Sequence, residues 1–416
     1  MGMSETRIFQ KKKNQDHRTI AKELDWYILD EKAGQGLPLL LPNWVFIRNK
    51  IQQLIRQKWA EYDFQEVITP ILGSEELYQT SGHLAHYQDY MFPAISRNNE
   101  TYYLRPMTCP HHCLIYQQKP RSYRELPFRL SENSLLHRYE TSGALKGLER
   151  VRSMELADHH IFLAPEQLKE EFKKNYHYVT DILATLNFKI SRLVCSLHDP
   201  NNREKYHSDE ELWKYSEELL VSSLNELNLN YMILKGEAAF YGPKLDIEIQ
   251  TADGKNVTVS TIQFDFILPQ KFGLNYIDKE QKLKTPAIIH QSPIGTYQRF
   301  ISLLLEQTNG KLPFWLVPCQ IVILPLNEEK EIKEYCKKIK KELTKNNLRA
   351  KILSEKSLNY RIRQVYQKKI PYYLVIGEEE AKTKILKLTY TYQEGKINGL
   401  TQEELYNKLN QENEHK

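Results

Sequence analysis

The chain has 416 residues, 41% of them hydrophobic and 27% charged, which is typical of a soluble globular protein with room for two or three domains. Its five cysteines are few and irregularly spaced, no signal peptide follows the polar N-terminus, and no apolar run could span a bilayer. A secreted disulfide framework and a membrane protein are therefore excluded, and we expect a cytoplasmic protein.

The net charge of +5 is unevenly distributed. Residues 317–416 hold 20 Lys and Arg against 14 Asp and Glu, while the rest of the chain is nearly neutral. A basic C-terminal part suits a polyanionic partner such as RNA. Charge alone nevertheless favours the simpler interpretation, a lysine-rich surface exposed to solvent.

The first half of the chain predicts helices and strands in alternation. After a flexible segment over 1–16, an apolar stripe predicts a helix over 42–62 capped by Asn43, and 64–70 reads as a strand stopped by proline. Two further strands and two amphipathic helices are predicted downstream. They are strands at 127–139 and 153–163, joined by the turn-rich 141–147, and helices at 165–187 and 210–227.

The stretch 237–268 is rich in strand patterns. Residues 245–249 and 257–262 flank Asp253-Gly254, a hairpin turn signal. Repeated hairpins with helices beside them predict an α+β domain built on a mixed, mainly antiparallel sheet flanked by helices.

From residue 317 the pattern changes to strands alternating with helices, which predicts a smaller α/β domain. The expected elements are strands at 321–324, 349–353 and 372–377 and helices at 328–345 and 358–368. The predicted organisation is a flexible N-terminus, a large α+β domain and a C-terminal α/β domain, over residues 1–16, 17–316 and 317–416.

Three residues are good candidates for a metal site: Cys109, His160 and His290. One thiolate and two imidazoles suit zinc, and three protein ligands leave a fourth position open, as in working sites. The ligands lie 51 and 130 residues apart, so their spacing alone does not establish a site.

Six stretches, in order along some 390 residues, carry a resemblance to one family. They are 16–18, 64–70, 128–140, 236–246, 290–300 and 360–380. Together they resemble the threonyl-tRNA synthetases, which are class II aminoacyl-tRNA synthetases. The stretches 64–70, 128–140 and 290–300 match motifs 1, 2 and 3 of that class, and 360–380 is similar to its anticodon-binding domain.

The resemblance implies a threonine–tRNA ligase. Such an enzyme activates L-threonine with ATP and Mg²⁺ to threonyl-adenylate, then transfers threonine to the 3′ end of tRNA(Thr). Motif 1 implies a homodimer. The family holds one Zn²⁺ per subunit, and the implied ligands here are Cys109, His160 and His290.

The resemblance also implies roles for individual residues. The catalytic residues are Arg138, Arg299 and His83, a histidine whose near-neutral pKa suits proton movement during acyl transfer. The ATP-binding residues are Arg138, Glu140, Arg150, Lys244 and Arg299. The threonine pocket is formed by Met107, Asp158, Tyr241 and Gln263. Arg361 and Arg363 are expected to bind tRNA. His111, His112 and His159 are expected to support the ligands from outside the ligand set or to lie at the surface.

Zinc and Asp158 are expected to select threonine over valine, because valine leaves the metal and the carboxylate unsatisfied, a loss of about 10⁴–10⁵ in such sites. Serine lacks only a methyl group, worth about 1–3 kcal/mol. The family's N-terminal and editing domains have no room before residue 17, so we expect no editing of serine in cis. The chain departs from the family at Glu149, Leu156, Thr258 and 291–293.

Two other functions remain open at this point. One is a catalytically impaired paralogue that binds tRNA, which loss of Arg138, Arg299 or a metal ligand would have favoured. The other is a class II synthetase for proline or serine, although the prolyl and histidyl enzymes do not need this set of one cysteine and two histidines.

Overall fold

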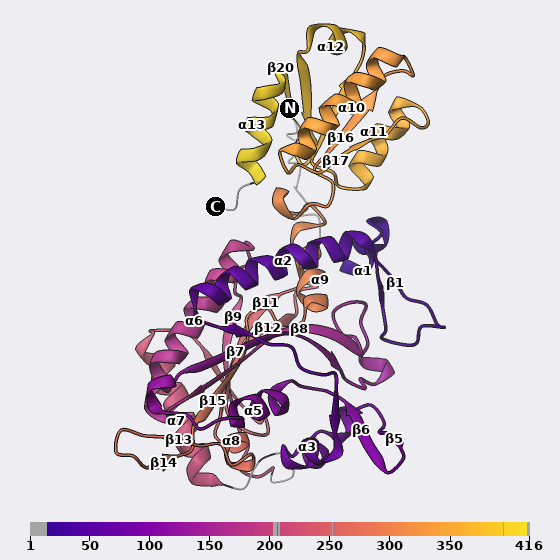
Figure 1. Ribbon diagram of the computed structural model, residues 1–416. Coiled ribbons are helices and arrows are strands. Elements are labelled where there is room, and N and C mark those ends of the chain that lie inside the picture. Colours follow the sequence, from indigo (N-terminus) through magenta and orange to yellow (C-terminus); the bar gives the residue numbers. More distant parts are fainter. Residues whose placement is uncertain (1–14, 203–205, 207–208, 252, 394, 414–416) are drawn as a thin grey trace, which may run out of the picture.

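The computed structural model describes residues 15–413 apart from 203–205, 207–208, 252 and 394. The predicted flexible segment 1–16 lies outside these residues except for its last two. Within the described residues the two largest sheets have eight and five strands. Figure 1 shows each sheet with its own helices, as two separate bodies. None of the described helices combines the length and the apolar character needed to cross a membrane.

The eight-stranded sheet is mixed and mainly antiparallel, as predicted. Only its two outer pairs, β10 with β9 and β3 with β7, are parallel. In spatial order the strands are β10 (Met232–Lys235), β9 (Arg192–Leu197), β11 (Lys244–Gln250), β12 (Asn256–Asp265), β15 (Ala287–Ser292), β8 (Ser153–Leu163), β7 (Phe128–His137) and β3 (Gln65–Glu66).

The predicted hairpin over 245–262 is present as β11 and β12. The turn depends on Gly254, which adopts a φ of +85°, a conformation that other residues rarely take. Thr251 N–H donates to the carbonyl of Lys255 at 2.8 Å and closes the turn.

Alternation along the central strands gives the sheet two different faces. Ile161 and Ile289 point into the main core beneath the helices α2 (Pro42–Glu61), α6 (Leu168–Thr185) and α9 (Tyr297–Thr308). Their neighbours Phe162 and Ile288 point the other way, into a second cluster under α5 (Cys109–Gln117). His160 is two residues from Phe162, and His290 is two residues from Ile288, so their side chains point toward this second face.

Shorter elements surround the large sheet. The helices are α1 (His17–Glu23), α3 (Glu75–Thr80), α4 (His83–His86), α7 (Glu210–Glu226) and α8 (Ile267–Lys271), with 3-10 turns η1 (Gln88–Tyr90), η2 (Tyr123–Glu125), η3 (Ser142–Ala144), η4 (Pro165–Gln167) and η5 (Phe314–Leu316). The strands are β1 (Tyr27–Ile28), β2 (Leu39–Leu40), β4 (Leu72–Ser74), β5 (Ile95–Arg97), β6 (Glu100–Leu104), β13 (Tyr276–Ile277) and β14 (Leu283–Lys284).

The C-terminal part is the predicted α/β unit. Its sheet runs β17-β16-β18-β19-β20, with β16 parallel to both β17 and β18 and the last two pairs antiparallel. The elements are β16 (Ile321–Pro325), α10 (Lys330–Lys345), β17 (Ala350–Ile352), α11 (Leu358–Gln367), β18 (Tyr372–Ile376), α12 (Glu378–Thr383), β19 (Leu386–Tyr390), β20 (Gly395–Leu400) and α13 (Gln402–Asn413).

Two local expectations were wrong. The helix predicted over 42–62 is present, but Asn43 does not cap it. The helix begins after Leu41, and the side chain of Asn43 donates to the carbonyl of Leu24 at 3.0 Å. Pro42 provides the helix start, because a first-turn proline has no N–H to leave unsatisfied. The strand predicted over 64–70 is only two residues long, since the chain leaves the sheet after Val67 N–H bonds the carbonyl of Ser131.

Arg361 was expected to bind tRNA, but it is only 4% exposed. Its guanidinium donates to the carbonyls of Pro325 and Leu353, both at 2.8 Å, and so ties α11 to the ends of β16 and β17. Arg363, two residues along the helix, is exposed. The structure therefore corrects the assignment of Arg361, whose contacts are internal.

We predict that Arg361→Ala destabilises the C-terminal part by about 2–4 kcal/mol, because it removes the guanidinium donor from one buried and one half-buried carbonyl. Arg363→Ala should change stability by less than about 0.5 kcal/mol. Urea unfolding followed by circular dichroism measures both. Equal stability of the two variants would contradict an internal role for Arg361.

Candidate active site

Three adjacent strands present a row of polar side chains on one face of the large sheet. His290 on β15 lies directly opposite His160 on β8 and, on its other side, opposite Gln263 on β12. The two imidazoles meet edge to face, with ring centroids 4.7 Å apart. The antiparallel register therefore brings together residues that are far apart in the sequence.

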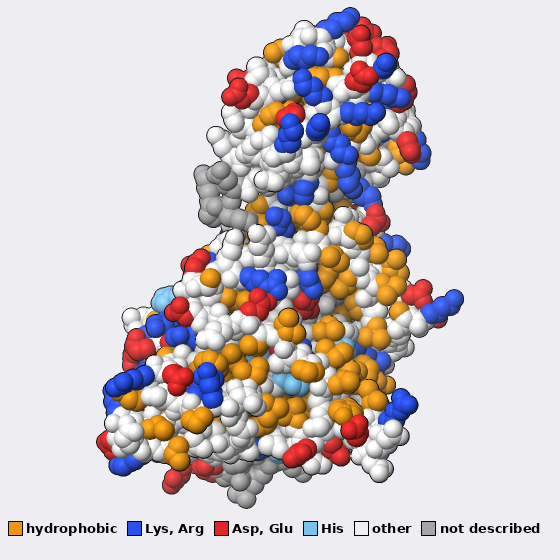
Figure 2. Space-filling view, in the orientation of Figure 1, with side chains coloured by type: hydrophobic (Ala, Val, Ile, Leu, Met, Phe, Trp, Pro, Cys, Tyr) orange, Lys and Arg blue, Asp and Glu red, His pale blue; other side chains and the backbone are white. Residues whose placement is uncertain are grey.

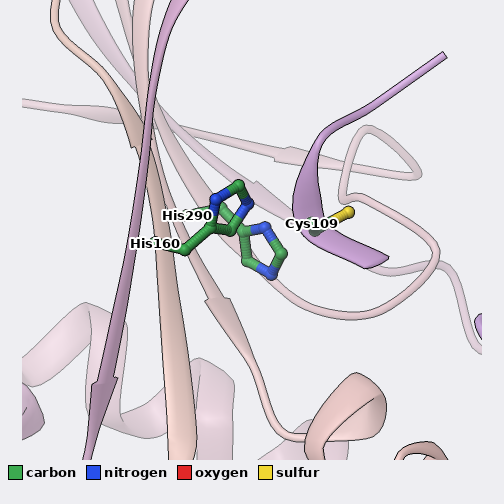
Figure 3. Close-up of side chains that lie close together, drawn as sticks. All are labelled: Cys109, His160 and His290. Carbon is green, nitrogen blue, oxygen red and sulfur yellow. The ribbon is translucent and has the colours of Figure 1, made fainter. Parts of the chain in front are cut away.

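Cys109 completes this group from a different element. It is the first residue of α5, which crosses the same face of the sheet, and Pro110 after it fits the first turn. Figure 3 shows Cys109 beside the two imidazoles. Potential ligand atoms of Cys109, His160 and His290 all lie within 4.8 Å of one another, and all three residues are buried.

Each imidazole is held through one nitrogen, which leaves the other free for a ligand. His160 Nδ1 lies 2.9 Å from Nδ1 of His112, whose Nε2 lies 3.2 Å from the carboxylate of Glu132. His290 Nε2 lies 2.7 Å from the carboxylate of Asp265. Outer partners of this kind orient metal-binding histidines.

The electrostatics of the group also fit a cation. Burial raises the pKa of the Cys109 thiol well above its usual value, and the nearby Cys113 and Asp158 add to the effect. Burial also lowers the pKa of His160, so the imidazole is neutral. A soft divalent cation would stabilise the thiolate and requires neutral imidazoles, so this donor set fits zinc.

The residues expected to bind threonine surround the three candidate ligands. Asp158 lies two residues before His160 on β8, hence on the same face, and burial raises the pKa of its carboxyl. The hydroxyl of Tyr241 donates to Gln263 at 2.6 Å, and its ring stacks on His290 at 4.7 Å. With Met107 they line one cavity of about 630 Å³.

Basic residues line the other half of the same cavity. Arg138 follows β7, and its Nε donates to the carbonyl of Pro106 at 3.2 Å. Arg299, near the start of α9, donates through Nε to the carbonyl of Glu149 at 3.0 Å. Arg150 lies 3.4 Å from the carboxylate of Glu140, and Lys244 pairs with Asp246.

Arg299 is held close to other positive charges. Burial lowers the pKa of its guanidinium, and Arg150 and Arg138 lower it further, against the opposing effect of Glu149 and Glu140. This cluster gains stability from a multivalent anion, because added negative charge relieves both the repulsion and the desolvation. One half of the cavity is thus suited to binding a polyanion, and the other half holds the candidate metal ligands.

His83 differs from the other expected site residues. It is fully buried, does not line the cavity, and bonds Ser81 Oγ through Nδ1 at 2.8 Å. Burial lowers its pKa to about 3, so the near-neutral value expected from the sequence is not what the structure gives. His86 lines the cavity instead and stacks on Phe240.

Sequence reasoning left out one residue that supports a candidate ligand. Asp265 was not singled out, although it lies two residues after Gln263 and so on the same side of β12. His111, His112 and His159 were expected to support the ligands from outside or to lie at the surface, and of the three only His112 contacts a candidate ligand. His159 lies on the opposite face of the sheet, where its Nδ1 lies 3.2 Å from the carbonyl of Gln291.

Comparison with known families agrees with this geometry. Residues 90–308 match the model of the tRNA synthetase class II core domain (G, H, P, S and T). The chain belongs to the class II tRNA synthetases. Residues 320–412 match an anticodon binding domain, and enzymes of this class use Mg²⁺ with ATP.

Proteins that are similar to this chain are named threonine–tRNA ligases. A threonine–tRNA ligase of Ureaplasma parvum serovar 3 is 46% identical over 374 residues, and one of Bacillus velezensis is 43% identical over 377 residues. Each alignment covers 90% of this chain but only 64% and 58% of the relative, so the chain spans about three-fifths of their length.

A solved structure covers nearly the whole chain. The RNA binding domain of threonyl-tRNA synthetase from Cryptosporidium parvum Iowa II superposes with a TM-score of 0.88 at 35% identity. The match covers 95% of this chain and 98% of that one. The two parts of this chain therefore share their fold with a class II synthetase.

We predict that inorganic tripolyphosphate raises the Tm of the protein, because it neutralises the arginine half of the cavity. Arg299→Ala should weaken tripolyphosphate binding about 10- to 100-fold, the loss expected for one charged hydrogen-bonding contact. Arg124→Ala, which removes an exposed arginine outside the cavity, serves as the matched control. An equal gain in Tm for both variants would show that the anion binds elsewhere.

Proposed function

We propose that the chain is a threonine–tRNA ligase that forms threonyl-adenylate from L-threonine and ATP and passes threonine to tRNA(Thr). One observation carries this proposal: Cys109, His160 and His290 meet within one cavity whose other half is lined by arginines. The named relatives, although longer, support the same substrates.

The first step joins two anions, the threonine carboxylate and the α-phosphate of ATP, so positioning and positive charge are its main needs. Arg138, one of the basic residues that line the cavity, would bridge the carboxylate and the phosphate. Arg299 would hold the nucleotide with its planar guanidinium, and Glu140 would accept from the adenine amino group. Arg150 and Lys244 would bind the outer phosphates together with Mg²⁺.

Cys109, His160 and His290 would hold one Zn²⁺ per chain. When bound, the ion supplies a Lewis-acidic position for the amine and hydroxyl of threonine. Asp158 would accept the hydroxyl hydrogen, while Tyr241, Gln263 and Met107 shape the pocket. Valine would leave Asp158 without a donor, which such polar sites reject by about 10⁴–10⁵.

Acyl transfer to tRNA would take place on the His83 side of the cavity. His83 is neutral, and its Nε2 has no hydrogen-bonding partner among the described residues. In place of the proton transfer suggested by a near-neutral pKa, we assign it a hydrogen bond with the terminal ribose, which requires tRNA binding to uncover the buried Nε2.

The tRNA would also contact the basic C-terminal part. We place the boundary between residues 316 and 317, next to Val317, the last residue of the main core, and a few residues before Ile321, where a separate core begins. Figure 2 shows Lys and Arg side chains gathered over this part of the molecule. With Arg361 buried, a direct contact with the anticodon arm falls to exposed residues such as Arg363.

Two chains would form a homodimer through the motif 1 region. Ile68 is 92% exposed, and Ile71 and Leu72, three and four residues further along the chain, are also exposed. Figure 2 shows hydrophobic side chains gathered over the larger part of the molecule. Light scattering distinguishes a dimer from the 49.3 kDa monomer. Exposed apolar residues elsewhere in this larger part include Ile28, Leu39 and Leu135.

We predict that the purified protein holds about one zinc per chain and that Cys109→Ala loses it together with threonine binding. Cys113→Ala is the control, since Cys113 is equally buried but outside the candidate ligand set. Elemental analysis and threonine binding measure the two effects. Full zinc content in Cys109→Ala would reject the proposed site.

The proposed function as a whole is tested by ATP–pyrophosphate exchange with a panel of amino acids. Threonine should drive exchange most strongly, serine about 10- to 200-fold less and valine at least about 10⁴-fold less. Exchange led by proline or serine would point to another class II synthetase. No exchange with any amino acid, together with retained tRNA binding, would favour the impaired paralogue.

A further inference from the structure

The segment 16–18 carries part of the family resemblance, yet none of its residues lines the cavity. His17 at its centre is fully buried although it is a polar residue. It begins α1, a short helix whose Ile20 and Ala21 pack into the main core together with Leu24, which follows the helix. A buried histidine at this place requires partners, because an unsatisfied polar group in a core is costly.

Both ring nitrogens of His17 are engaged, one by α9 and one by the loop between β7 and β8, and both of these elements carry residues that line the cavity. Nδ1 lies 2.8 Å from Oε1 of Glu306, near the end of α9. Nε2 accepts the backbone N–H of Leu148 at 3.3 Å, in the 138–152 loop that joins β7 to β8. Because the backbone N–H can only donate, Nε2 is unprotonated, and Nδ1 carries the hydrogen that it donates to Glu306.

Asp16, His17 and Glu306 lie close enough together to suggest a cation site. The hydrogen bonds argue against one, since neither nitrogen of His17 remains free for a metal. The carboxylate of Asp16 is also occupied, by the backbone and the guanidinium of Arg18. The cluster is a link between segments.

The link acts on the residues placed around ATP. Leu148 is followed by Glu149, whose carbonyl accepts Arg299 Nε at 3.0 Å, and then by Arg150. Arg299 and Glu306 lie on the same helix seven residues apart, about two turns, and so on similar faces. Arg299 therefore holds the loop from the cavity side, and Glu306 holds it through His17 from the core side.

The loop and the His17 ring lie too close together for a side chain at position 147. Gly147 has a φ of +52°, and a Cβ there would lie 2.5 Å from His17 Nε2. Only glycine allows the loop to approach the ring so closely. Leu148 itself is fully buried in the main core, so the N–H that it donates has a fixed direction.

We propose that His17 is a positioning residue for the nucleotide: it fixes the 138–152 loop against α9 so that Arg150 and Arg299 meet ATP in one arrangement. That these arginines bind ATP rests on the proposed function. The evidence for the link between α1, α9 and the loop is the hydrogen bonds of His17, and it does not depend on the proposed function.

Two substitutions separate the two hydrogen bonds. In His17→Asn the amide nitrogen can replace Nδ1 and keep Glu306, but the side chain is too short to reach Leu148. In His17→Gln the amide oxygen can reach the Nε2 position and accept from Leu148. Thr19→Ala, on the exposed side of α1, is the control.

The full chain is measured in three ways: amide hydrogen exchange at Leu148, dissociation constants for ATP and threonine, and zinc content. His17→Asn should speed exchange at Leu148 and weaken ATP binding by about 3- to 10-fold, the equivalent of one hydrogen bond. Threonine binding and zinc content should stay unchanged, and His17→Gln should restore most of the ATP affinity.

Equal losses for ATP and threonine in both variants would reduce His17 to a general stability role and overturn the proposal. So would unchanged exchange at Leu148 in His17→Asn. A wild-type chain that binds no ATP would refute the proposed function instead, and the exchange at Leu148 would then decide the link by itself.

Discussion

The register of three antiparallel strands is the constraint on which the rest of the site depends. It sets Gln263, His290 and His160 in one row across β12, β15 and β8. Because side chains alternate between the faces of a sheet, a shift of one residue would turn both histidines into the main core. The helices α2, α6 and α9 prevent such a shift by packing against the apolar side chains of the other face.

Beside this row, buried polar side chains are joined in a hydrogen-bonded chain. Burial opposes the charge on Glu132, but hydrogen bonds from His112, Thr69 and Arg105 lower its pKa to about 2. The carboxylate then holds His112, which in turn holds His160. Fully satisfied networks of this kind stiffen a site, whereas a half-satisfied one would weaken it. The arginine half is left short of negative charge, and a nucleotide would supply it.

The sequence predicted the fold class and most long elements, because hydrophobic period and turn signals are local properties. It placed β8 and β16 within a residue or two, and it identified Cys109, His160 and His290 through family motifs. It failed where distant contacts decide. In the sequence nothing distinguishes Arg361 from a surface arginine. Only the fold shows that it donates to the carbonyls of Pro325 and Leu353. The partners of His17 are 131 and 289 residues away, beyond any local pattern.

The central claim is that one thiol and two imidazoles converge on a single metal ion. X-ray absorption at the zinc edge of the purified, unmodified protein tests it most directly. The account predicts one sulfur ligand at about 2.3 Å and two or more nitrogen or oxygen ligands at about 2.0–2.1 Å. A zinc signal with no sulfur ligand, or with four, would contradict it.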